Sequence, residues 1–178
     1  MKVVVTGLPG IGKTTLIKKI AHNLGKRAIG FWTEEVRDRK TKKRIGFKVI
    51  TTEGEQMLFA SKTFSSKYLV GSYGVNVERF ERIVLPLFEK IKKEGKGKVI
   101  IVDEVGKMEL FSKSFRNQIR DIVFNPTTDI IITIPLRDVH PLVRDIRRLP
   151  SAVLIELNKE NREVMEQEIL KLFTQGRG

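Results

Sequence analysis

The sequence has no cysteine, and this absence removes several kinds of chemistry at once. Disulfide bonds, a thiol nucleophile and thiolate metal ligands are all excluded. Low-complexity tracts are missing too, and no apolar run approaches the length that a membrane-spanning helix needs. The sequence therefore argues against a disulfide-stabilised fold, a thiolate metal centre and a membrane protein.

What is present is typical of a globular protein. Hydrophobic residues make up 40% of the chain and charged residues 31%. A length of 178 residues suffices for one well-packed domain and is short for two, so we expect residues 1–178 to form a single domain. An apolar strand begins almost at the N-terminus and leaves no room for a signal peptide, so we expect a cytoplasmic protein, and a monomer.

Residues 7–14 fit the phosphate-binding pattern GxxxxGK[ST]. An apolar run at 3–5 precedes them, and a helical pattern with apolar residues on one face follows, so the order is strand, loop and helix. The glycines let the backbone curl so that its N–H groups point at phosphate oxygens, and the helix dipole adds positive potential. The eight predicted nucleotide-binding residues are Gly7, Leu8, Pro9, Gly10, Ile11, Gly12, Lys13 and Thr14.

Two side chains of this loop have predicted chemical roles. Lys13 can reach the β- and γ-phosphates, and the Thr14 hydroxyl can bind Mg²⁺ directly. The plainer interpretation is a glycine-rich turn that only connects a strand to a helix. The residue types and the flanking elements together favour a nucleotide site with Mg²⁺ as the cofactor.

A second chemical motif follows the apolar run 99–102, which is typical of a strand buried on both faces of a parallel sheet. Asp103 ends this run, and we expect the strand to lie beside the strand of the phosphate loop. Asp103 could then hold Mg²⁺ through a water molecule, while Glu104 orients or deprotonates the attacking water. The alternative is that the two carboxylates only cap a turn after a strand.

The remaining pattern alternates strands with helices and predicts an α/β fold, a mostly parallel, doubly wound sheet with ligands at the carboxyl ends of its strands. A basic turn before alternating residues predicts an antiparallel hairpin inserted at 37–51, with a further strand at 57–60. Residues 61–76 are interpreted as a mobile loop. Asn158 is a plausible cap for the last helix.

Two short stretches are similar to motifs of guanine-nucleotide switches. Residues 103–106 satisfy DxxG, in which the glycine N–H would meet the γ-phosphate. Residues 158–161 nearly satisfy NKxD, but Asn161 stands where a carboxylate accepts two hydrogen bonds from guanine. The mismatch argues against a dedicated GTP switch, while GTP stays open as one accepted substrate.

The net charge of +13 raises the question of nucleic acid. Basic residues gather at 37–44, which looks like a hairpin tip, and at 90–98, which looks like the solvated end of a helix. Aromatic side chains that could stack on bases are sparse in both segments. Nucleic acid is therefore a possible partner but not the favoured one.

Four stretches together, 7–15, 30–37, 103–111 and 159–162, resemble the small nucleoside-triphosphatase family called THEP-type or cancer-related nucleoside triphosphatases. The resemblance runs over essentially the whole chain. It implies a RecA-like variant of the P-loop fold and Mg²⁺-dependent hydrolysis of NTP to NDP and phosphate, with broad base tolerance and slow turnover. It also implies that a Walker B segment lies at the nucleotide, formed by Lys98, Val99, Ile100, Ile101, Val102, Asp103, Glu104 and Val105.

We therefore expect a nucleoside-triphosphatase, with catalytic roles for Lys13 and Glu104 and metal binding by Thr14 and Asp103. A positive charge often completes such sites, and Lys107 and Arg137 follow strand ends from which either could reach the γ-phosphate. A small-molecule or nucleoside kinase is the alternative, with the hairpin at 37–44 as its candidate lid. A nucleic-acid-associated NTPase switch is the third possibility.

Overall fold

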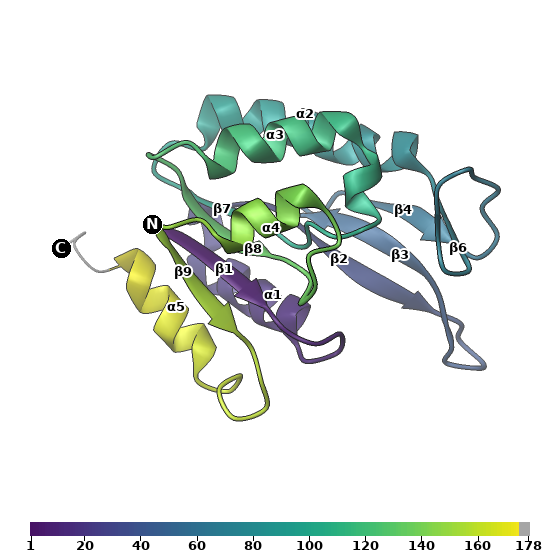
Figure 1. Cartoon of the computed structure of the whole chain (residues 1–178), viewed down its shortest axis with the longest axis horizontal. Coiled ribbons are helices and arrows are strands. Elements are labelled where there is room, and N and C mark those ends of the chain that lie inside the picture. The colour runs from purple at the N-terminus through teal and green to yellow at the C-terminus, as the bar shows by residue number, and fades with distance from the viewer. Residues whose placement is uncertain (175–178) are drawn as a thin grey trace.

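The computed structural model describes residues 1–174. Within them, nine strands form one sheet in the order β5-β6-β4-β3-β2-β7-β8-β1-β9 (Figure 1). The strands are β1 (Lys2–Thr6), β2 (Ala28–Arg37), β3 (Arg44–Thr51), β4 (Gln56–Ser61), β5 (Leu69–Val70), β6 (Tyr73–Val75), β7 (Val99–Val102), β8 (Asp129–Thr133) and β9 (Ala152–Glu156). The helices are α1 (Lys13–Leu24), α2 (Val77–Glu94), α3 (Lys113–Val123), α4 (Pro141–Arg147) and α5 (Met165–Thr174), with short 3-10 turns η1 (Gly25–Arg27) and η2 (Glu109–Phe111).

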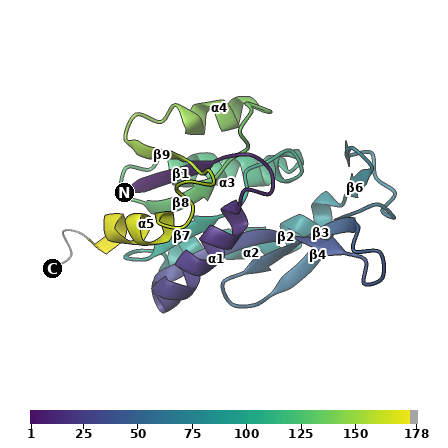
Figure 2. The ribbon, with the colours of Figure 1, turned by 90° about the horizontal axis from the view of Figure 1, so that it is seen from below.

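The sheet has a parallel part and an antiparallel part. β2, β7, β8, β1 and β9 pair in parallel, whereas β3, β4, β6 and β5 continue the sheet antiparallel from β2. Figures 1 and 2 show this antiparallel extension projecting from the end of the sheet opposite β9 and α5. The predicted parallel α/β fold with an inserted hairpin is confirmed, with the insertion larger than a single hairpin.

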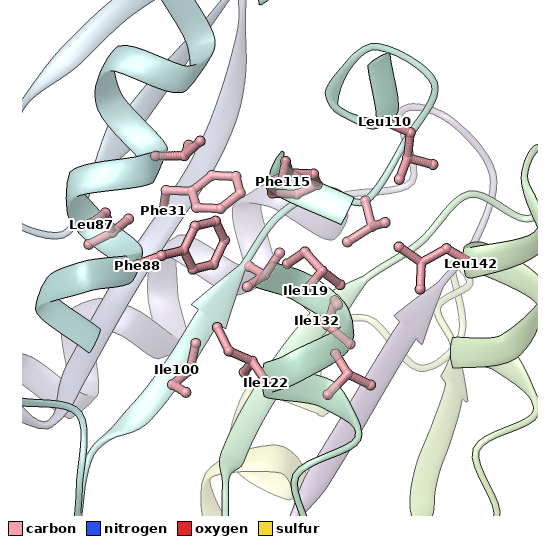
Figure 3. Packing of buried hydrophobic residues seen from close by; sticks show 14 of the residues in the cluster. Phe31, Leu87, Phe88, Ile100, Leu110, Phe115, Ile119, Ile122, Ile132 and Leu142 are labelled. Atoms are coloured by element: carbon pink, nitrogen blue, oxygen red, sulfur yellow. The ribbon is translucent and has the colours of Figure 1, made fainter. Parts of the chain in front are cut away.

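Helices cover both faces of the parallel part. α2, α3 and α4 pack on one face, and α1 and α5 pack on the other. Each face has its own hydrophobic cluster, the first under α2, α3 and α4 and the second under α1 and α5. Side chains alternate along β1, so Val4 belongs to the first cluster and Val3 and Val5 belong to the second. Figure 3 shows the first cluster, where the rings of Phe31 and Phe115 meet edge to face at 6.0 Å between centroids. Because both faces of β1, β7 and β8 are buried, these three strands consist of nearly continuous apolar runs.

The prediction for the position of the strand that ends at Asp103 is wrong. We expected β7 to lie beside β1, but β8 lies between them and pairs with both. The three strands are all short, apolar and buried on both faces, so their sequence patterns do not distinguish their order in the sheet. The observed order separates the two phosphate-site strands by one strand.

Two local expectations are also wrong. Residues 61–76 are not an irregular loop, since they contain β5 and β6, and Val75 is buried. Asn158 does not cap the last helix, which begins at Met165; its side chain instead accepts a hydrogen bond from the Asn161 N–H at 2.8 Å, in a turn. None of the helices described within 1–174 is long and apolar enough to cross a membrane.

Candidate active site

The phosphate loop joins β1 to α1 at the carboxyl edge of the parallel strands. Gly10 and Gly12 have φ angles of 79° and 111°, which L side chains rarely adopt, so these two positions require glycine. No side chain caps the first turn of α1, and that turn contains no acidic residue. Its N–H groups therefore face the loop with positive potential, an arrangement suited to an anionic phosphate.

Lys13 begins α1 and is 11% exposed at its side chain. Its Nζ donates a hydrogen bond to the carbonyl oxygen of Gly7 at 2.7 Å and lies 3.7 Å from Glu104 Oε2. The ammonium is thus held between the loop backbone and the carboxylate that follows β7. From this place it can supply positive charge to phosphate oxygens in the loop.

Asp103 receives hydrogen bonds from two other elements. The Thr14 hydroxyl of α1 donates to Oδ2 at 2.8 Å, and the Thr133 hydroxyl at the end of β8 donates to Oδ1 at 2.5 Å. The side chain is buried, and burial raises the pKa of Asp103 while the Thr133 and Thr14 hydrogen bonds lower it. Sequence reasoning missed Thr133, because a threonine at a strand end has no signal that sets it apart.

Glu104 follows through a cis peptide bond and is 29% exposed at its side chain. Burial of its inner part raises the pKa of Glu104, and the neighbouring Asp103 raises it further, while Lys13 lowers it. A raised pKa in a carboxylate that still faces solvent is the property expected of a group that accepts a proton from water. The two adjacent carboxylates therefore have different surroundings.

A cavity of about 600 Å³ connects these groups. One wall contains loop and strand-end residues that the sequence predicted, together with Pro135 and Leu136 after β8. The other wall comes from β2 and β3, which the sequence connected with the site only through the candidate kinase lid at 37–44. Alternation along β2 places Thr33, Glu35 and Arg37 on one face. The cavity residues are Gly7, Pro9, Gly10, Gly12, Lys13, Thr14, Thr15, Lys18, Thr33, Glu34, Glu35, Arg37, Arg44, Phe47, Asp103, Glu104, Pro135 and Leu136.

The β2–β3 wall contains an ordered group of charges. Glu35 forms ion pairs with Arg37 at 2.7 Å and with Arg44 at 3.2 Å. Arg44 also donates from Nε to the Tyr73 hydroxyl at 3.0 Å, and its guanidinium lies 5.4 Å from the centre of the Phe47 ring. The predicted basic hairpin therefore reaches the cavity through its base, while its turn extends beyond it.

Several predicted site residues lie away from the cavity lining. Leu8 is exposed, and Ile11 turns its side chain toward Gly7. Val99, Ile100, Ile101, Val102 and Val105 are buried in the core. Lys98 precedes β7 at the opposite edge of the sheet and lines a different cavity of about 410 Å³.

The two predicted charge donors, Lys107 and Arg137, are exposed and do not line the cavity. Arg147 of α4, which the sequence analysis did not select, lies at the strand ends instead. Its guanidinium donates to the Pro135 carbonyl at 2.5 Å and to the Thr6 hydroxyl at 3.4 Å. No local sequence pattern shows that the end of α4 lies near the ends of β1 and β8, so Arg147 could be found only from the fold.

The groups at this edge fit a magnesium ion. Thr14 Oγ1 and Asp103 Oδ2 are adjacent, and hydroxyl and carboxylate oxygens are ligands that Mg²⁺ accepts. Within residues 1–174 no group of three or more His, Asp or Glu side chains could hold a metal ion. An ion held by one hydroxyl and one carboxylate needs further oxygens from water and from phosphates, which is the usual way that Mg²⁺ binds with a nucleotide.

The residues that resemble guanine-nucleotide switch motifs form hydrogen bonds within the chain. The Gly106 N–H, which DxxG would direct at a γ-phosphate, donates to Glu109 Oε1 at 3.0 Å. The Asn161 side chain donates to the Glu156 carbonyl and accepts from the Asn158 N–H. Next to it, Arg162 donates to the Ile11 carbonyl at 3.3 Å, so this turn supports the phosphate loop from outside.

The sheet order, the glycine loop at a helix N-terminus and the Thr14–Asp103 pair together define a P-loop nucleotide-binding protein. The sequence model of the NTPase family matches residues 2–170. The chain belongs to this family.

Named relatives agree with that assignment. Nucleoside-triphosphatase THEP1 of Aquifex aeolicus is 62% identical over 176 residues, which cover 97% of this chain and 99% of the relative. The human cancer-related nucleoside-triphosphatase is 36% identical, with 94% of each chain covered. The crystal structure of THEP1 from the hyperthermophile Aquifex aeolicus superimposes with a TM-score of 0.92 at 58% identity, covering 98% of this chain and 100% of that one. The solution structure of a human cancer-related nucleoside triphosphatase gives 0.82 at 34% identity, with 99% of each covered.

Proposed function

We propose that this chain, an NTP hydrolase of the NTPase family, uses Mg²⁺ to convert ATP, GTP and other nucleoside triphosphates to the diphosphate and phosphate, with broad base tolerance and slow turnover. The observation that carries the proposal is the different environment of the two adjacent carboxylates. Asp103 is buried and hydrogen-bonded to Thr14, whereas Glu104 is partly exposed beside Lys13. One is suited to a metal site and the other to a proton acceptor.

The residues divide the work of binding. Backbone N–H groups of the phosphate loop and the Lys13 ammonium hold the phosphate oxygens, where negative charge gathers during transfer. Thr14 and Asp103 would hold the magnesium ion. The bound ion supplies charge neutralisation at the β- and γ-phosphate oxygens.

Glu104 provides the acid–base step. A water oxygen attacks the γ-phosphorus and forms a new P–O bond, while the bond from that phosphorus to the β,γ-bridging oxygen breaks. Glu104 takes the proton that the water loses, and the diphosphate leaves with the bridging oxygen. Lys13, 3.7 Å from Glu104 Oε2, lowers the pKa of that carboxylate and so opposes the effect of burial.

The surroundings of the site support low base selectivity. Asn161, the counterpart of the guanine-reading carboxylate, uses its side chain for contacts inside its own turn. Neither Lys107 nor Arg137 lines the cavity. The cavity cations other than Lys13 form ion pairs with Glu34 or Glu35, which agrees with slow turnover; they are Lys18, Arg37 and Arg44. A cytoplasmic location, a monomeric state and the roles of Lys107 and Arg137 stay predictions.

A kinase is the second candidate, and one observation favours it. The cavity continues from the phosphate loop to a wall of β2 and β3 that contains Glu35, Arg44 and Phe47, which leaves room for an acceptor molecule beside the γ-phosphate position. The test is phosphate release by purified protein with ATP, GTP, CTP and UTP, with and without Mg²⁺. Parallel reactions add nucleosides and nucleoside monophosphates.

Release in NTP and Mg²⁺ alone, unchanged by acceptors, supports hydrolysis. Phosphorylated acceptor appearing at the expense of free phosphate supports the kinase. Stimulation of phosphate release by RNA or DNA would support a nucleic-acid-associated switch instead.

A further inference from the structure

Glu109, which none of the phosphate motifs includes, is a buried carboxyl near the site. It begins η2, is 5% exposed, and its Oε1 accepts a hydrogen bond from the buried Gly106 N–H at 3.0 Å. Burial raises the pKa of Glu109 to about 8. Near neutral pH this side chain is therefore mainly an uncharged acid that serves as a hydrogen-bond acceptor.

The carboxyl groups of Glu109 and Glu104 both lie next to Gly106. A Cβ atom placed on Gly106 would lie 2.6 Å from Glu104 Oε1 and 3.0 Å from Glu109 Oε1, so both carboxyl groups pack against one side of this glycine. The charge of Glu104 is also one cause of the raised pKa of Glu109. Gly106 leaves the space in which the two side chains approach each other.

Hydrogen bonds fix the turn that follows Glu104. The Val105 N–H donates to the Thr133 carbonyl at 3.0 Å, and the Gly106 N–H donates to Glu109. The Leu110 N–H then donates back to the Gly106 carbonyl at 3.0 Å. Without the Glu109 acceptor, a buried N–H would lose its partner, and the turn would have to rearrange to find another.

We propose that Glu109 is a positioning residue for hydrolysis, which holds the Gly106 amide and thereby fixes the turn that directs Glu104 into the cavity. This inference rests on the proposed function, in which Glu104 accepts the proton of the attacking water. An uncharged acid suits the role, because it accepts the amide hydrogen bond without a second full negative charge beside Glu104. Gly106, the glycine of the DxxG-like stretch, thus helps to position the proton acceptor Glu104 and does not contact a phosphate.

The experiment compares two substitutions of Glu109 with a matched control. Glu109→Leu removes the acceptor and keeps a similar volume, whereas Glu109→Gln keeps a carbonyl oxygen that can accept from the Gly106 N–H. The control is Ser112→Ala. Ser112 is also buried, at the end of the same short segment, but it caps α3 and donates to Glu81, away from the cavity.

Glu109→Leu should lower the single-turnover hydrolysis rate by about ten- to a hundredfold, the range that a misplacement of about 1 Å produces. Its Kd for Mg²⁺·ATP should stay within about threefold of wild type, since the phosphate loop is unchanged. Glu109→Gln should restore the rate to within about threefold of wild type. Ser112→Ala should lower the unfolding temperature and leave the rate within about twofold.

A wild-type rate in Glu109→Leu would overturn the inference, and so would a Glu109→Gln enzyme as slow as the leucine variant. If Glu109→Leu does not fold, Glu109→Asp provides the same test, because its shorter carboxyl cannot reach the Gly106 N–H. The rate should again fall, and a wild-type rate in Glu109→Asp would overturn the inference as well.

The Glu104→Gln background separates this inference from the proposed function. If Glu109 acts only through Glu104, adding Glu109→Leu to Glu104→Gln should slow hydrolysis by no more than about twofold, whereas a general structural role would slow it again. A further tenfold loss in the double variant would overturn the positioning role. Wild-type turnover in Glu104→Gln alone would refute the proposed function, whatever Glu109 does.

Discussion

The Thr133 hydroxyl donates to Asp103 Oδ1 at 2.5 Å, and this bond joins the end of β8 to the end of β7 at the candidate metal site. Thr133→Val keeps the shape and removes the donor, so a buried carboxylate oxygen loses its partner. We expect a loss of about 1–3 kcal/mol in unfolding free energy. We also expect a higher Mg²⁺ concentration for half-maximal hydrolysis, because the carboxylate is no longer oriented.

Thr133→Ser is the matched control, since it retains the hydroxyl, and it should behave nearly as wild type in both measurements. Chemical denaturation and Mg²⁺ titration of turnover provide the readings. Normal Mg²⁺ dependence in the valine variant would remove Thr133 from the site.

Lys13→Ala should abolish measurable hydrolysis and weaken nucleotide binding, because the ammonium that meets the β- and γ-phosphate oxygens is lost. Lys19→Ala is a suitable control, because it removes the same charge from an exposed position on the same helix. Calorimetric binding of Mg²⁺·ATP and steady-state phosphate release would be compared for both variants. Equal behaviour of the two would contradict the assignment of the phosphate loop.

Glu104→Gln and Asp103→Asn should differ. Glu104→Gln should bind Mg²⁺·NTP within a few-fold of wild type and lose turnover by roughly 10²- to 10⁴-fold, the usual contribution of a positioned general base. Asp103→Asn should weaken Mg²⁺ dependence and nucleotide binding together, because its charge no longer faces the ion. Binding and single-turnover hydrolysis, each with Mg²⁺ varied, would distinguish them. An equal loss of affinity in both variants would place Glu104 in the metal site.

Stability should depend on pH through Glu109. Its pKa is about 8 in the folded chain and near 4.5 when unfolded, so between these values the folded state keeps a proton that the unfolded state has released. The contribution is complete below pH 4.5 and is lost as the pH rises through 8, with a limiting slope of about 1.4 kcal/mol per pH unit.

Glu109→Gln removes this titration. The unfolding free energy of the variant relative to wild type should therefore rise from pH 5 to pH 8 and then level off. Urea denaturation of both proteins across this range gives the difference directly. A difference that stays constant with pH would mean that Glu109 is not a proton-holding group in the folded chain.

Base tolerance is a further prediction. ATP and GTP should be hydrolysed with specificity constants within roughly tenfold of each other, about 1.4 kcal/mol, because Asn161 stands where the guanine-reading carboxylate would be. A competition assay with both nucleotides in one mixture would measure the ratio. A preference above roughly a thousandfold, about 4 kcal/mol, would reveal a base pocket that these residues do not provide.

The sequence predicted those site residues that belong to short, recognisable sequence patterns. The phosphate loop and the pair Asp103 and Glu104 could be located because each depends on a short pattern next to a strand. The structure brings Lys13, Thr14, Asp103 and Glu104 to one cavity. Their chemical roles stay predictions until variants are measured.

The sequence could not predict features that depend on contacts between distant parts of the chain. The runs that form β1, β7 and β8 have the same apolar character, so their order in the sheet has no local signal. Glu109 lies in a stretch with hydrophobic neighbours that looks like an ordinary turn, and only the fold shows that its carboxyl meets the Gly106 amide. Arg44 and Phe47 line the cavity through the register of β2 with β3, which composition alone does not determine.

The position of β8 between β1 and β7 also affects the local unfolding of the sheet. Asp103 is fixed by hydroxyls from α1 and from β8, so the site spans three segments that are far apart in the chain. A nucleotide bound to the folded form alone would therefore make opening of all three less frequent, by mass action. Amide hydrogens at residues 130–133, which belong to neither phosphate motif, should exchange with solvent more slowly once a nucleotide is bound.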